Sequence, residues 1–197
     1  MRPVRIASLV ATIAVASATF SDAALAHIGG HAGGFTNGLA HPFYGFDHVL
    51  AMIAVGLWAS QLGRPALWLL PATFPLVMAA GFALGAAGVA LPWVEIAIAG
   101  SVIVLGALIA FALRPSIAFS AAIIGLFALF HGHVHGTELP AHGTALTFGL
   151  GLVLATLVLH GIGLTIGLLA FRSAGRIAMR AAGGAIAVLG VALLVLH

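Results

Sequence analysis

A short segment ahead of the first long apolar stretch combines two histidines with an aspartate. Its sequence is His41-Pro42-Phe43-Tyr44-Gly45-Phe46-Asp47-His48. A carboxylate beside a hydrocarbon layer is costly, so Asp47 is expected to serve a function. Asp47 could cap the following helix, since Asp is a favoured N-cap residue, but a cap does not account for His41 and His48. Imidazoles beside a carboxylate are typical of a divalent cation site or a proton relay.

A second segment carries three histidines and a glutamate. Its sequence is Phe130-His131-Gly132-His133-Val134-His135-Gly136-Thr137-Glu138. If a helix continues through it, His131, His135 and Glu138 lie on one face, because residues three and four apart are neighbours on a helix. His133 then points away from that face. The two glycines in the segment could instead end the helix early.

Other histidines are weaker candidates. His160 lies in the middle of an apolar stretch with Thr156 one turn earlier, and it could be a second station on a path or a packing hydrogen bond. His27, His31 and His142 lie outside the apolar stretches, where they could capture metal.

The elements that position these residues are predicted to be membrane helices. Of the 197 residues 62% are hydrophobic and 6% are charged, which is too little polar surface for a soluble domain. Apolar stretches near the length that crosses a bilayer recur along the chain. We therefore expect an all-α bundle of six transmembrane helices, at about 43–62, 66–88, 93–112, 116–135, 144–171 and 176–196.

The composition excludes several other classes. The chain has no cysteine, so a metal site must use imidazole, carboxylate, thioether or backbone groups, a set that suits borderline divalent ions. It has seven arginines, no lysine and no basic run, so nucleic acid is not an expected partner. It contains no GxxxxGK[ST] loop and no HExxH motif, so neither ATP hydrolysis nor a zinc peptidase is expected.

The N-terminus has the features of an export signal. Arg2 and Arg5 precede a short apolar core, and Ala24-Leu25-Ala26 supplies a small-x-small cleavage pattern before His27. We expect residues 1–26 to be a cleaved signal peptide, 27–42 an exposed periplasmic arm rich in His and Gly, and 43–197 the transmembrane domain. The alternative is an uncleaved first helix.

Arginine placement predicts the orientation. With the mature N-terminus outside, the first, third and fifth loops face the cytoplasm. The five remaining arginines lie in or beside those loops, as the positive-inside rule requires: Arg64, Arg114, Arg172, Arg176 and Arg180. The expected location is therefore the bacterial inner membrane, with both mature termini and both His-rich segments on the periplasmic side.

Small residues and prolines inside the stretches predict how the helices pack. The Gly81/Gly85 and Gly163/Gly167 pairs have the spacing that permits close helix approach in lipid. Pro71 and Pro75 should kink the second helix, for packing or for a pathway.

At its two His-rich segments the chain resembles the HupE/UreJ family of nickel permeases. The resemblance rests on the HPxxGxDH element (41–48) and the FHGHxHGxE element (130–138), and it extends over essentially the whole mature chain. It implies uptake of nickel, or in some members cobalt. It also implies that six residues match positions important for transport: His41, Asp47, His48, His131, His135 and Glu138. Further candidates are His133, His160, His27 and His31.

The sequence thus predicts a secondary, non-ATP transporter of divalent nickel rather than an enzyme. No cofactor is expected; the partners are the transported ion and the lipid bilayer, and a homo-oligomer is compatible with the sequence. Nitrogen and oxygen ligands bind nickel and cobalt with neighbouring affinities, so a cobalt permease of the same type is the first alternative. A membrane metal sensor or metal chaperone without transport is the second, and an intramembrane metalloenzyme is the third.

Overall fold

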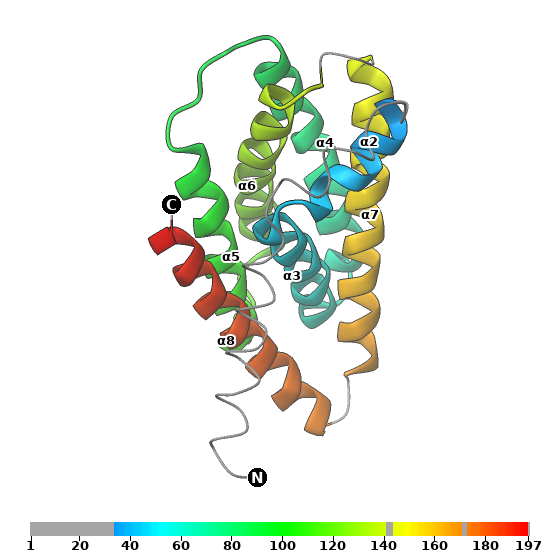
Figure 1. The fold of residues 1–197 in the computed structure, drawn as a ribbon. Helices are drawn as coiled ribbons and strands as arrows, with labels where there is room; N and C mark the ends of the chain where they lie inside the picture. The colour runs from blue at the N-terminus through cyan, green and yellow to red at the C-terminus, as the bar shows by residue number, and fades with distance from the viewer. Residues whose placement is uncertain (1–33, 141–143, 171–172, 197) are drawn as a thin grey trace. The chain divides into compact units, whose positions relative to one another are not determined.

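The computed structural model describes residues 34–140, 144–170 and 173–196, and these residues form helices with no strand among them (Figure 1). The all-α prediction is confirmed for this part of the chain. In chain order the helices are α2 (Gly34–Ala40), the 3-10 helix η1 (His41–Phe43), α3 (Phe46–Leu62), α4 (Ala66–Ala86), α5 (Val94–Ala110), α6 (Ile117–Thr137), α7 (Ala145–Leu169) and α8 (Ser173–Leu196). The six predicted ranges agree with α3 to α8 within a few residues.

The helices differ in whether they are long enough to cross a bilayer. Four are long and apolar enough, namely α4, α6, α7 and α8. A fifth candidate is the segment of Gly34–Phe43 with Phe46–Leu62, which is bent by 82°. Helix α5 is apolar but has only 17 residues. Several membrane-crossing helices are therefore present, and the predicted total of six crossings stays a prediction.

Residues 34–42, the described part of the predicted arm, are helical, in α2 and η1. Helix α2 packs along α7, and the backbones approach so closely that a side chain at Gly38 would meet the Phe148 carbonyl. Pro42, in η1, is buried. Tertiary packing outweighs the low helix propensity of this glycine-rich stretch. The predicted signal peptide and His27, His31, His142, Arg172 and His197 lie outside the described residues.

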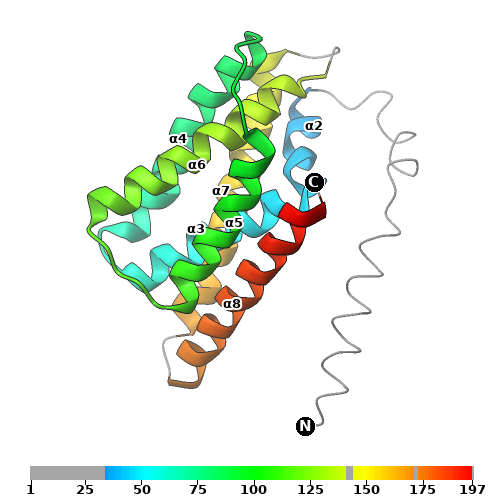
Figure 2. The same ribbon diagram turned by 90° about the vertical axis from the view of Figure 1, so that its left-hand side faces the viewer.

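The bundle is built from three closely packed helix pairs, α3 with α7, α4 with α6 and α5 with α8 (Figure 2). Glycines lie at the crossings, as predicted. A side chain at Gly81 or Gly85 would meet the backbone of α6, and one at Gly163 would meet the Ile53 carbonyl of α3. Helices α3 and α6 belong to different pairs and make no extensive contact with each other in the described residues.

The described arginines gather at one end of the bundle. Arg64 lies between α3 and α4, and Arg114 lies between α5 and α6. Arg176 and Arg180 lie in the first turns of α8, where Arg180 Nε donates to the Ala110 carbonyl (2.8 Å). The two His-rich segments lie at the other end, at the start of α3 and the end of α6.

Candidate metal site

The first segment forms a hydrogen-bonded pair at the start of α3. The carboxylate oxygen Oδ1 of Asp47 accepts from the imidazole Nδ1–H of His48 (2.7 Å) and from the backbone N–H of the same residue (2.8 Å). Gly45 occupies the N-cap position, so Asp47 binds its neighbour rather than capping the helix. A Cβ at Gly45 would lie 2.6 Å from His48 Nδ1 and 2.7 Å from Asp47 Oδ1. The glycine therefore makes room for the pair.

The hydrogen bond to Asp47 determines which nitrogen of His48 is available. A carboxylate only accepts, so Nδ1 carries the proton and Nε2 keeps its lone pair. Nε2 of His48 is buried and has no hydrogen-bond partner. His131 has the same arrangement, because its Nδ1–H donates to the Phe127 carbonyl (2.9 Å) and its buried Nε2 has no partner. Metal-binding histidines usually donate the other ring N–H to a carboxylate or a carbonyl in this way.

The second segment is helical up to Thr137, the last residue of α6, and Glu138 follows as the C-cap. His131 and His135 therefore share one face, as predicted. The glycines do not end the helix because they pack against α4. A side chain at Gly132 would meet the Met78 carbonyl, and one at Gly136 would meet the Phe82 carbonyl.

Three residues form an entrance cluster at the surface of the site: His41, His135 and Glu138. His41 Nε2 lies 2.9 Å from Glu138 Oε2, and His135 Nδ1 lies 3.9 Å from the same oxygen. Each offers one ligand atom, and these atoms lie within 4.8 Å of one another. A cavity of about 170 Å³ lies here, lined by the cluster with Tyr44, Gly45 and His48. The Glu138 side chain is 51% exposed, so the cluster is accessible from outside the bundle.

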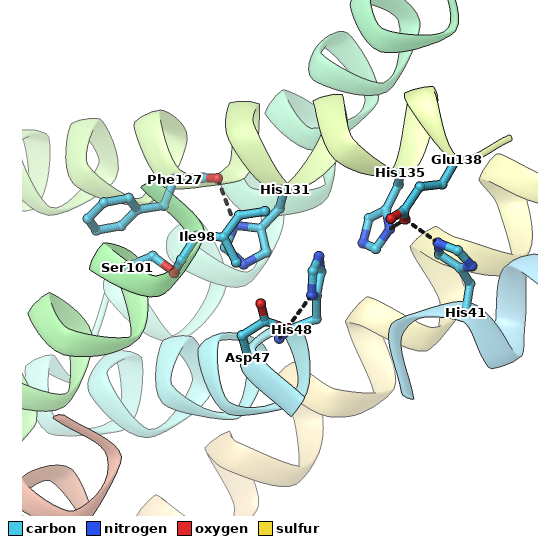
Figure 3. A network of polar contacts seen from close by, with 9 residues as sticks. All are labelled: His41, Asp47, His48, Ile98, Ser101, Phe127, His131, His135 and Glu138. Carbon is cyan, nitrogen blue, oxygen red and sulfur yellow. Dashed lines mark hydrogen bonds and ion pairs between the residues drawn. The ribbon is translucent and has the colours of Figure 1, made fainter. Parts of the chain in front are cut away.

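The two segments converge through their imidazoles (Figure 3). The ring centroid of His48 lies 4.5 Å from that of His135 and 5.0 Å from that of His131. The centroids of His41 and His135 are 4.9 Å apart. The structure therefore brings all six predicted residues to one place, where four imidazoles lie together with the carboxylates of Asp47 and Glu138.

The remaining candidates lie elsewhere. His133 is turned away from the site, as predicted, and its Nε2–H donates to the Val89 carbonyl (2.7 Å). His160 is buried deeper in the bundle, and neither of its nitrogens has a hydrogen-bond partner.

Sequence reasoning missed Phe74 of α4. Its ring lies 5.4 Å from that of His131 and 5.1 Å from that of His160, between the site and the deeper histidine. The sequence signal that could have found it is the pair of prolines that flank it, Pro71 and Pro75.

Comparisons with known proteins agree with this architecture. The family model described as HupE / UreJ protein matches residues 14–193. Protein HupE of Rhizobium leguminosarum bv. viciae is 48% identical over 184 residues, which cover 93% of this chain and 96% of that protein. No solved structure matches the chain. With a match over most of its length and both His-rich segments in place, the chain belongs to the HupE/UreJ family of nickel and cobalt permeases.

Proposed function

We propose that this protein takes up divalent nickel across the bacterial inner membrane by secondary transport. The observation that carries the proposal is the pair of buried, unpartnered Nε2 atoms on His48 and His131. Leaving buried polar atoms unpaired costs free energy. Each of these imidazoles is also held by a hydrogen bond at its other nitrogen, so each ring presents a buried lone pair that a metal ion could accept.

The ligand types suit a borderline divalent ion. Imidazole nitrogens replace part of the ion's water shell, and the carboxylates of Asp47 and Glu138 offset its two positive charges. Without these negative charges, the full desolvation free energy of the cation would oppose its entry into a low-dielectric site. Binding must still be weak enough to allow release, which is achieved when several sites share the ion in turn.

The entrance cluster is the first of these sites in our proposal. The ion first meets His41 and Glu138, which are the more exposed members. His135 then passes it to His48 and His131, because its ring lies beside both His41 and His48. One imidazole is exchanged at a time, so the ion is never without nitrogen ligands along this row.

The orientation and the ends of the chain are part of the same proposal. With arginines on the cytoplasmic side, the entrance cluster faces the periplasm and six spans place both mature termini there. The signal peptide is removed before His27, and His27 and His31 then lie in the periplasm, where they help to capture the ion.

The test is metal flux through the full-length protein in proteoliposomes loaded with a nickel-responsive dye. We expect saturable nickel uptake, with cobalt, zinc and copper measured alongside to rank the ions. Faster cobalt than nickel uptake would identify a cobalt permease of the same type. Saturable binding without flux of any of these ions would overturn the transport proposal in favour of a sensor or chaperone.

A further inference from the structure

A histidine beyond the candidate metal site is buried without a partner. His160 lies 15 residues after the first residue of α7, Ala145, or about 22 Å along the helix axis. Its side chain is 1% exposed, and neither ring nitrogen makes a hydrogen bond. A histidine that served only packing would normally bond a neighbouring helix.

The helix that faces His160 has, at the same level, a backbone carbonyl without its usual helical donor. Pro75 has no N–H, so the carbonyl of Pro71, four residues earlier in α4, lacks its helical donor. Pro71 and His160 line the same cavity, and neither nitrogen of the buried His160 ring has a hydrogen-bond partner. Two kinds of electron-pair donor, a ring nitrogen and a carbonyl oxygen, therefore occur at one level of the bundle.

Both groups line a cavity of about 260 Å³ between α4 and α7. Its other lining residues are Leu67, Trp68, Ala72, Leu157, Gly161 and Leu164. Against this apolar lining, the imidazole and the carbonyl are the groups suited to bind a cation.

The ring of Phe74 lies beside both the candidate metal site and the deeper histidine. Its centroid is 5.4 Å from that of His131 and 5.1 Å from that of His160. One turn nearer the entrance, the Thr156 hydroxyl donates to Met78 Sδ (3.7 Å) between the same two helices. The face of an aromatic ring attracts cations, so an ion that moves past Phe74 would still be stabilised by the ring.

We propose that His160 and the Pro71 carbonyl form a second, deeper binding station for the transported divalent cation, separated from the outer histidines by Phe74. The inference rests on the proposed function, since it assigns the next site on the same path. A station at this depth lowers the cost of the ion in the middle of the bundle. It also gives the multiple sites that conduction requires.

The first experiment distinguishes nickel binding at the outer histidines from nickel transport through the bundle. His160→Leu protein in proteoliposomes should bind nickel at the outer histidines with wild-type affinity, measured by calorimetry. Nickel uptake by this variant should fall by about 100-fold. This factor corresponds to the cost of moving the ion through the middle of the bundle without the His160 ligand. Wild-type uptake by His160→Leu would overturn the station.

A second variant tests the carbonyl without touching the histidine. Pro75→Ala supplies the missing N–H, which pairs the Pro71 carbonyl within α4. We expect reduced uptake with His160 still in place. The control is Thr73→Ala, which removes a side-chain hydrogen bond to the Leu69 carbonyl in the same turns of α4 and should leave uptake unchanged. Equal uptake by Pro75→Ala and Thr73→Ala would remove the carbonyl from the proposal.

A third measurement does not depend on transport. The chain has no cysteine, so His160→Cys carries a unique thiol that cadmium should bind, with an ultraviolet charge-transfer band. Leu164→Cys, in the wall of the same cavity, should give no band. If wild-type protein shows no flux but the His160→Cys band appears, the transport proposal fails and the binding station stands. A missing band in folded His160→Cys protein overturns the station itself.

Discussion

The imidazoles of His48 and His135, which come from opposite halves of the chain, lie with their ring centroids 4.5 Å apart. Each is backed by a carboxylate, since His48 bonds Asp47 (2.7 Å) and His135 lies 3.9 Å from Glu138. The pair joins the entrance cluster to the buried part of the site, so substitutions on either side of it should affect metal binding differently.

Asp47→Asn should lower nickel affinity and uptake by about 10- to 100-fold, the usual effect of altering a group that orients a metal-binding histidine. The amide oxygen can still accept from His48, so the geometry is kept while the negative charge is lost. Calorimetric titration with nickel and proteoliposome flux measure the two effects. Wild-type values for both Asp47→Asn and Asp47→Ala would exclude Asp47 from the site.

His131→Ala and His133→Ala are a matched pair, two residues apart on α6 and both buried. We expect His131→Ala to lose nickel binding, because its Nε2 faces the site. His133→Ala should bind nickel normally but unfold more easily, by about 1 to 3 kcal/mol, because the Val89 carbonyl loses its donor. Thermal unfolding in detergent and nickel titration distinguish the two, and the reverse pattern would contradict the assignment.

Gly45→Ala should weaken nickel binding by about tenfold, since the added Cβ displaces the imidazole and carboxylate that hold each other beside it. Gly100→Ala is the control, because a Cβ there meets nothing within 4 Å. Equal nickel affinity in the two variants would show that the Asp47–His48 pair is not needed in its present position.

Nickel binding should weaken as the pH is lowered below neutral, because protons compete with the ion for the imidazole lone pairs. Titrations at several pH values, with the number of protons released per ion, provide the measurement. Binding that stays constant below neutral pH would argue against imidazole ligands.

Gly132→Ala should destabilise the fold by about 1 to 3 kcal/mol, as overpacking does, because its Cβ would collide with the Met78 carbonyl of α4. Gly125→Ala, on the same helix, meets only side-chain atoms at 3.7 and 3.9 Å and should be tolerated. Thermal unfolding of the two variants makes the comparison. Similar stability would mean that α4 and α6 can separate at little cost.

Much of the site could be predicted because ionisable residues are rare within and beside apolar membrane helices. Asp47 and Glu138 are acids at the ends of apolar helices, and three histidines lie within the last two turns of α6. Such groups are costly unless they serve a function. Helical spacing then placed His131 and His135 on one face and turned His133 away, which the structure confirms.

The rest depends on contacts between segments that are distant in sequence. Helix α2 forms because Gly38 and Gly151 let its backbone approach α7, and a glycine-rich stretch gives no local sign of this. The position of Phe74 beside His131 and His160 depends on how α4, α6 and α7 cross. The spacing of residues along a single helix does not predict those crossings.

The site also lies between helices that do not otherwise hold each other. His48 is on α3, which packs on α7, whereas His131 and His135 are on α6, which packs on α4. Helix α4 joins the two pairs, because it packs against α3 and α7 as well as α6. An ion bound by histidines of both α3 and α6 would therefore add a reversible link between two helices that are otherwise connected only through their neighbours.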